Sequence, residues 1–201
     1  MPNLHRKRKE LDNAEIDKLL LVTGHRKAGW RDHVLYSLAI GSGMREHELA
    51  ALTWDMVLTK PSGGTSSIRS IFEIDVFKGS ARIGGTQEIR LPPDCQRKLY
   101  SHWRRSGKPV SGPVFVSRHS NPLSTRAMRH GFKKWQEAAG LERDFTFHSL
   151  RHTFCRLAKE AANMDFSQVQ LLARHARLET TMTYLQPGDV ALMETIKKIR
   201  A

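Results

Sequence analysis

The spacing of apolar residues departs from the helical period in one stretch of this 201-residue chain, and that departure constrains the fold more than any other feature. Apolar and acidic side chains alternate through residues 72–76, FEIDV, with the period of a half-buried strand. Ile89 and Leu91 predict a partner strand, and residues 79–86 a hairpin connection between the two. Elsewhere apolar residues recur at helical spacing. We therefore expect an α+β fold that is mainly α, with one small antiparallel β-sheet or hairpin.

Local signals predict where several helices begin and end. Asp12 and Glu15 have the spacing of a capping box, which would begin a helix that runs to about Leu21. Ser124 is a predicted N-cap, and Gly140 would end the helix that follows it. Apolar spacing predicts further helices around residues 30–40, 46–52, 99–103, 148–161 and 167–174, and after residues 187–188.

The charge balance is strongly positive. Lys and Arg number 33 against 20 Asp and Glu, which gives a formal net charge of +13 and a sequence pI near 10.2. A surplus of this size favours a polyanionic partner. The basic residues are spread along the whole chain, whereas a membrane-surface protein more often carries one basic amphipathic helix or a terminal cluster. We therefore expect nucleic acid, and no membrane, as the partner.

Other features bear on where the protein acts. Apolar stretches such as residues 34–40 are too short to span a bilayer, and residues 1–10 lack the apolar segment of a signal peptide. The two cysteines, Cys95 and Cys155, fall in apolar helical patterns and are expected to be buried thiols in a reducing compartment. The expected location is cytoplasmic.

Four motifs contain polar residues that could act together in one reaction. They are GMREHEL at residues 43–49, a lysine at the end of the predicted strand, FHSLRH at 147–152 and HARLETTMTY at 175–184. Each alone has an ordinary explanation, such as a surface arginine, a solvated lysine, a polar helix face or a packed tyrosine. The residues concerned are, in chain order, Arg45, Lys78, His148, Arg151, His175 and Tyr184.

A metal site is one alternative for the third motif. His148 and His152 are four residues apart on a predicted helix, which is the spacing of a zinc-protease motif. That motif requires a glutamate beside the first histidine, and here the neighbour is Ser149. The sequence shows no further ligand cluster, no cluster of carboxylates that would hold a pair of metal ions and no GxxxxGK[ST] phosphate loop. We expect neither a metal nor a cofactor.

Taken together, the four motifs resemble one family. The order Arg, Lys, His-x-x-Arg, His, Tyr is similar to the catalytic set of tyrosine site-specific DNA recombinases, the phage-type integrases. The surrounding residues are similar too, as in SGMR at 42–45, FTFHSLRHTF at 145–154 and VQLL at 169–172. The resemblance covers roughly residues 11–186. It implies a catalytic domain there, a flexible basic arm over residues 1–10 and a tail helix in 187–201, which would either be exchanged between protomers or fold back on its own core.

The resemblance implies that Tyr184 is a nucleophile that attacks a DNA phosphodiester. Arg45 and Arg151 would then hold the nonbridging oxygens of the transition state, a task that suits the planar guanidinium group. His148 and His175 would donate further hydrogen bonds and help to move the phenolic proton.

The remaining implied roles concern the leaving group and the support of the site. Lys78 would protonate the leaving 5′-oxygen, although the hairpin after it is longer than usual and leaves Lys60 and Arg82 as alternatives. Glu48 would orient the groups that touch the phosphate. Before His175 the family usually has Leu-Gly; here residues 173–174 are Ala-Arg, and Arg174 could contact a phosphate.

The arm is the other candidate for DNA contacts. Its basic residues could bind phosphates without regard to sequence, or form a solvated tail. They are Arg6, Lys7, Arg8 and Lys9. Most family members carry an N-terminal domain before the catalytic one, so the chain is expected to be either a fragment or a naturally short recombinase.

The sequence thus predicts an enzyme that cleaves and rejoins double-stranded DNA through a covalent 3′-phosphotyrosine intermediate. Re-ligation would need no ATP, because the phosphotyrosine bond keeps the free energy of the phosphodiester. The resemblance implies a homo-oligomer, a tetramer on DNA, and leaves accessory DNA-bending proteins open. Two alternatives remain: a type IB topoisomerase, and a DNA-binding regulator derived from a recombinase.

Overall fold

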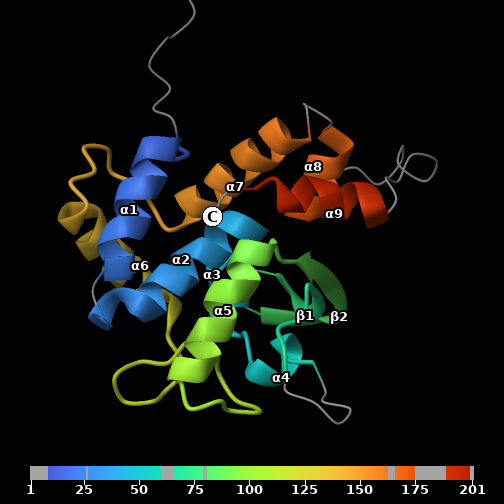
Figure 1. Ribbon diagram of the computed structural model, residues 1–201, viewed down its shortest axis with the longest axis horizontal. Helices are drawn as coiled ribbons and strands as arrows, with labels where there is room; N and C mark the ends of the chain where they lie inside the picture. The colour runs from blue at the N-terminus through green and yellow to red at the C-terminus, as the bar shows by residue number, and fades with distance from the viewer. Residues whose placement is uncertain are drawn as a thin grey trace, which may run out of the picture.

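A computed structural model describes residues 9–25, 27–59, 66–78, 81–162, 166–174 and 189–199 (Figure 1). Over these residues the chain is mainly helical, with one two-stranded antiparallel sheet, so the expected fold class is confirmed. The elements are α1 (Asn13–His25), a 3-10 helix η1 (Lys27–Gly29), α2 (Trp30–Ser42), α3 (Glu46–Ala50), α4 (Trp54–Val57), β1 (Ile71–Lys78), β2 (Ala81–Arg90), α5 (Pro93–Arg105), α6 (Thr125–Ala138), α7 (His148–Ala161), α8 (Phe166–Ala173) and α9 (Asp189–Lys197).

Helix α2 is the central element of the core. Residues 32–42 of this helix are all buried, and α1, α5 and α7 pack around it. The ring of Tyr36 meets those of Phe132 and Phe147 edge to face, with centroids 5.3 and 6.1 Å apart. In Figure 1 the hairpin lies on one side of α2 and α1 and α6 on the other, while α7, α8 and α9 lie together at one end. A helix buried along almost its whole length in this way belongs to the core of the domain.

The hairpin corrects one expectation from the sequence. Residues 79–86 were expected to connect two strands, but residues 81–86 belong to β2. Asp75 pairs with Thr86 and Phe77 with Arg82, so a single residue of β1 lies opposite three of β2. Gly84 and Gly85 take positive φ angles of 85° and 79°, which glycine adopts without strain. These glycines form an irregularity inside a strand and not a loop.

Both predicted helix starts are confirmed. Asp12 and Glu15 form the capping box: the backbone N–H of each donates to the other's carboxylate at 2.9 Å. The hydroxyl of Ser124 accepts from the N–H of Ala127 at 3.2 Å, so Ser124 caps α6. Helix α1 runs on to His25, four residues beyond the expected end.

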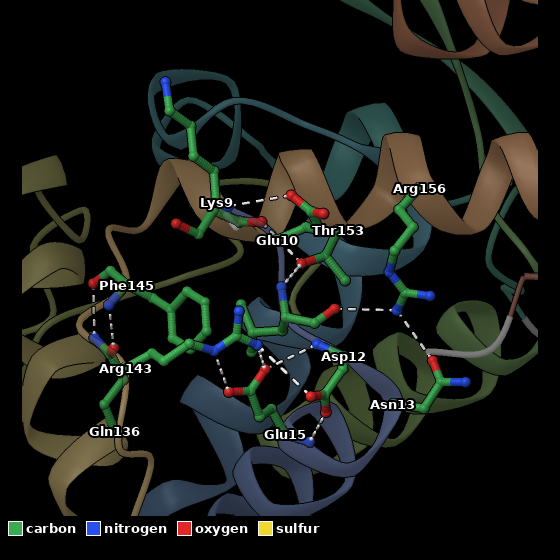
Figure 2. Close-up of polar contacts among 12 residues, drawn as sticks. Lys9, Glu10, Asp12, Asn13, Glu15, Gln136, Arg143, Phe145, Thr153 and Arg156 are labelled. Atoms are coloured by element: carbon green, nitrogen blue, oxygen red, sulfur yellow. Dashed lines mark hydrogen bonds and ion pairs between the residues drawn. The ribbon is translucent and has the colours of Figure 1, made fainter. Parts of the chain in front are cut away.

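A polar cluster fastens the start of α1 to α7 and to the loop before α7 (Figure 2). The buried N–H of Leu11 donates to the hydroxyl of Thr153 at 2.9 Å, and the guanidinium of Arg156 donates to the Leu11 carbonyl at 3.0 Å. The guanidinium of Arg143 pairs with the carboxylate of Glu15. These contacts join residues far apart in sequence, and they fix where the chain enters the domain.

The hydroxyl of Thr153 should therefore contribute to stability. Thr153→Val keeps the shape of the side chain but leaves the buried N–H of Leu11 without its acceptor. We expect the free energy of unfolding to fall by about 1–3 kcal/mol, measured by urea denaturation. Thr86→Val, on the exposed face of β2, is the control and should change it by less than about 0.5 kcal/mol. Equal effects of the two substitutions would contradict this assignment.

Helix α9 packs against α7 and α8 of its own chain. Ile196 and Ile199 are buried, and the hydroxyl of Thr195 donates to the side-chain oxygen of Gln168. This packing corresponds to the fold-back arrangement considered for the tail helix. Exchange of the helix between protomers stays a prediction.

Two expectations from composition can also be compared with the described residues. None of the helices in the described ranges combines the length and the apolar character that crossing a membrane requires. Cys95 and Cys155 are both free; Cys95 is fully buried, which raises the pKa of its thiol to about 12, and Cys155 is half-buried.

Candidate functional site

The site is built on a tight turn, residues 42–45, which joins α2 to α3 and which we call the arginine turn. Gly43 ends α2 with φ 62° and ψ 20°, and its N–H donates to the Ala39 carbonyl at 3.1 Å. A side chain at Gly43 would place its Cβ 2.3 Å from the ring of Phe154, which comes from α7. Only glycine allows both this backbone conformation and this approach of α7. The turn thereby brings Arg45 beside α7.

Gly43→Ala should be strongly destabilising. The substitution adds left-handed backbone strain to a steric clash, and we expect a loss of about 2–4 kcal/mol in the free energy of unfolding. Gly140→Ala is a matched control, since Gly140 has the same φ of 62° but no heavy atom within 4 Å of an added Cβ. The control should lose only about 1 kcal/mol. Equal losses in urea denaturation would mean that the Phe154 contact is unimportant.

Glu48 is the centre of the polar contacts at this turn. Its carboxylate is buried and accepts four hydrogen bonds. The donors are the backbone N–H of Arg45 at 2.8 Å, the Arg45 guanidinium at 2.8 Å, the Gln87 amide at 3.0 Å and the Arg174 guanidinium at 3.0 Å. Burial alone would raise the pKa of Glu48, but the charge of Arg174 and the hydrogen bonds from Arg45 together lower it below its ordinary value.

The lowered pKa predicts how stability depends on pH. A carboxyl group whose pKa is lower in the folded than in the unfolded chain stabilises the fold fully above its unfolded pKa of about 4.3. That stabilisation is lost as the pH falls through the folded pKa. The difference in free energy of unfolding between the wild type and Glu48→Gln should therefore shrink as the pH is lowered from neutral to below about 4. A difference that does not vary with pH would contradict the ionised assignment.

Arg151 reaches the same turn from α7. Its side chain is buried, and its guanidinium donates to the backbone carbonyls of Gly43 and Ala173. Burial, together with the positive charges of Arg45 and Arg174, lowers the pKa of Arg151 to about 10. The carbonyls hold the guanidinium in place, and the group stays protonated at neutral pH.

Arg174 completes the cluster from the end of α8. Its guanidinium donates to the carbonyls of Ser42 and Gly43, each at 3.3 Å, and forms the ion pair with Glu48. Only 8% of its side chain is exposed, against 31% for Arg45. Sequence reasoning missed this ion pair; the signal that could have found it is a basic residue in the place of the family's glycine.

His148 and His152 lie one turn apart on α7, with ring centroids 4.8 Å apart and planes at 85°. Burial and the neighbouring positive charges, including those of Arg151 and Arg45, lower the pKa of His148, so its ring is neutral at neutral pH. In the ranges that the structure describes, no three His, Cys, Asp or Glu side chains come together as possible metal ligands.

The other predicted site residues are described in part or not at all. Lys78 ends β1 and pairs with Ala81 through the backbone, but its side chain, like that of Arg82, lies outside the described part. Lys9 is described, and its N–H donates to the carboxylate of Glu10 at 3.1 Å. Residues outside the description are Arg6, Lys7, Arg8, Lys60, His175 and Tyr184. The structure thus brings together Arg45, Glu48, Arg151 and Arg174, with His148 close by.

Comparison with known proteins shows the family of this chain. The profile of the phage integrase family matches residues 9–189. The chain belongs to this family. Tyrosine recombinase XerC of Actinobacillus pleuropneumoniae serotype 7 is 29% identical over 182 residues, which are 88% of this chain and 54% of that protein. XerC of Proteus mirabilis is 28% identical over 183 residues, again 88% of this chain and 54% of the relative. The chain therefore spans about half the length of the curated relatives it matches.

Solved structures of family members share the fold. The integrase of mycobacterium phage Brujita superposes with a TM-score of 0.69 at 20% identity, over all of this chain and 60% of that one. The catalytic core of lambda integrase gives a TM-score of 0.63 at 21% identity, over 86% of this chain and 95% of the core. The mainly helical fold with its two-stranded sheet is therefore that of an integrase catalytic core.

Proposed function

We propose that this chain cleaves and rejoins double-stranded DNA as a site-specific recombinase, through a covalent 3′-phosphotyrosine intermediate formed on Tyr184. The observation that carries the proposal is the convergence of Arg45 and Arg151 at the arginine turn, in a chain of the phage integrase family. The two arginines are far apart in sequence and come from the arginine turn and from α7. A phosphate between them would meet two guanidinium groups at once.

The contacts of these arginines suit transition-state stabilisation. In-line attack on a phosphodiester gathers negative charge on the nonbridging oxygens. Glu48 and two backbone carbonyls already hold Arg45 and Arg151, so little reorganisation is needed when that charge develops. Three guanidinium groups surround the single carboxylate of Glu48, and the formal excess of two positive charges favours an anion in this place.

Tyr184 is the tyrosine best suited to be the nucleophile. The chain has three tyrosines. Tyr36 is fully buried in α2, and burial raises its pKa far above the ordinary value, so its hydroxyl reaches no DNA. Tyr100 is half-buried on α5, with its ring 5.5 Å from that of Trp103. Tyr184 remains, nine residues after His175 in the segment that resembles the family's third motif.

In the proposed reaction, one phosphate ester bond replaces another. The Tyr184 oxygen forms a bond to phosphorus, the bond to the 5′-oxygen breaks, and the leaving oxygen takes a proton from Lys78. The phenolic proton passes to a histidine, for which His148 is suited because its ring is neutral at neutral pH. His175 adds a hydrogen bond to the phosphate. Reversal by a 5′-hydroxyl rejoins the strand without ATP.

Partners and domains belong to the same proposal. A lambda integrase fragment has been solved as a dimer bound to a core site, and Tn1549 integrase in complex with circular intermediate DNA. We propose double-stranded DNA as the partner here and a homo-oligomer, a tetramer, as the active assembly. Residues 1–10 would be a DNA-binding arm, 11–186 the catalytic domain and 187–201 a tail helix. The net charge of +13 supports DNA as the partner.

Covalent capture tests the proposal. The protein is incubated with sheared genomic DNA of its source, denatured, and the DNA that stays attached is sequenced. We expect attached ends at one recurrent sequence. Ends scattered without preference would favour a topoisomerase-like enzyme. Tight binding without attached DNA would favour a binding regulator and contradict the proposal.

A further inference from the structure

Arg174 has a conformation that needs an explanation. Its φ of 54° lies in the left-handed region, which is strained for residues other than glycine. A glycine, the residue usual in the family here, would adopt it freely. The strain persists only where surrounding contacts compensate for it. In Arg174 those contacts are the side chain's hydrogen bonds to Ser42, Gly43 and Glu48.

The contacts of Arg174 end on groups that hold the proposed phosphate clamp. Glu48 is shared: one oxygen accepts from the guanidinium of Arg45 and from Gln87, and the other from Arg174 and the backbone of Arg45. The Gly43 carbonyl is also shared, between Arg174 and Arg151. Arg174 therefore binds the carboxylate that holds Arg45 and one of the two carbonyls that hold Arg151.

We propose that Arg174 is a positioning residue, which neutralises Glu48 so that the charge of Arg45 remains available to the DNA phosphate. This inference rests on the proposed function. Without Arg174, the whole attraction of the buried carboxylate would fall on Arg45 and draw its guanidinium away from the phosphate. Arg174 also ties the end of α8 to the arginine turn.

The ion pair of Arg174 with Glu48 favours this role over a direct phosphate contact. The guanidinium of Arg151 is also buried and bonded, but it donates to neutral backbone carbonyls, which leave its charge available to a phosphate. The charge of Arg174 is instead paired with the buried carboxylate of Glu48, and both of its terminal nitrogens donate to protein oxygens. Its effect on DNA cleavage should therefore pass through Glu48.

The test uses Arg174→Gly, which removes the guanidinium while suiting the left-handed backbone, so the variant should fold. Cleavage is followed as covalent adduct formed in a single turnover on nicked DNA duplexes of the recurrent sequence that covalent capture recovers. At saturating DNA we expect the rate to fall about tenfold, the loss of one charged hydrogen bond, with DNA affinity unchanged. Arg174→Lys, which keeps the charge, should recover most of the rate. Arg97→Ala, on an exposed residue of α5, controls for lost charge and should leave the rate unchanged.

A double-mutant cycle with Glu48→Gln tests whether Arg174 affects the cleavage rate through Glu48. In the Glu48→Gln background there is no carboxylate to neutralise, so adding Arg174→Gly should change the rate by less than about twofold. A full tenfold loss in that background would overturn the inference. So would an unchanged rate in Arg174→Gly alone, or a slope of log affinity against log salt that is lower by about 1, which marks a lost phosphate contact. A wild type without any adduct would instead overturn the proposed function, and this inference with it.

Discussion

Tyr184→Phe should abolish covalent attachment to DNA while leaving DNA binding intact. Phenylalanine keeps the ring but lacks the oxygen that attacks phosphorus, and no other tyrosine of the chain is placed to replace it, because Tyr36 is buried and Tyr100 is packed on α5. The measurement is an adduct assay on denaturing gels beside a mobility-shift assay on native gels. We expect no detectable adduct and an affinity within about twofold of the wild type, since most of the binding comes from phosphate contacts elsewhere.

Tyr100→Phe is the matched control. It removes the hydroxyl of a half-buried tyrosine on α5 and should leave adduct formation unchanged. Adduct formation that survives in Tyr184→Phe would assign the nucleophile elsewhere. A parallel loss of binding and adduct would show only that the substitution disturbs the fold or the DNA surface.

Arg151→Ala should slow adduct formation by about 100-fold, comparable to the loss of one oxyanion donor. The guanidinium is buried at the arginine turn and held by two backbone carbonyls, so its position relative to a bound phosphate is fixed before the reaction begins. The substitution also removes one donor from each of these carbonyls and so lowers the stability of the fold. Rates are therefore compared at saturating DNA, with urea denaturation confirming that each variant is folded under the assay conditions.

Arg156→Ala is the control for Arg151→Ala. Arg156 lies on the same helix, α7, but its guanidinium donates to Leu11, Asn13 and Glu160, away from the arginine turn. Its loss should lower stability without changing the rate at saturation. An unaltered rate in Arg151→Ala, or equal slowing in both variants, would remove Arg151 from the site.

The elements of the fold were predictable where local signals agreed with packing. The capping box at Asp12 and Glu15, the N-cap at Ser124 and the apolar period of α2 all act within a few residues, so the sequence displays them directly. The hairpin was predicted incorrectly because Gly84 and Gly85 signal a turn as readily as a bulge. The short helices η1 and α4 were missed, since segments of three and four residues have no period to read.

The motifs named several residues that the structure brings together, but they did not predict the contacts between them. Sequence motifs pointed to Arg45, His148 and Arg151 as site residues. Glu48 was predicted from its place three residues after Arg45. The pairing of Glu48 with Arg174 joins positions 126 residues apart, and it depends on where α8 ends relative to the arginine turn. The position of the end of α8 is set by the packing of α7 against α8, which the pattern of a single sequence does not encode.

Identification of the DNA-linked residue tests the central claim most directly. The covalent adduct is digested with nuclease and trypsin, and the peptide that carries a nucleotide remnant is sequenced by mass spectrometry. We predict a single modified peptide spanning residues 178–197, with the phosphate on Tyr184. A phosphate on Tyr100, on a serine or on a histidine would contradict the account, and so would a chain that binds and cleaves DNA without leaving any residue modified.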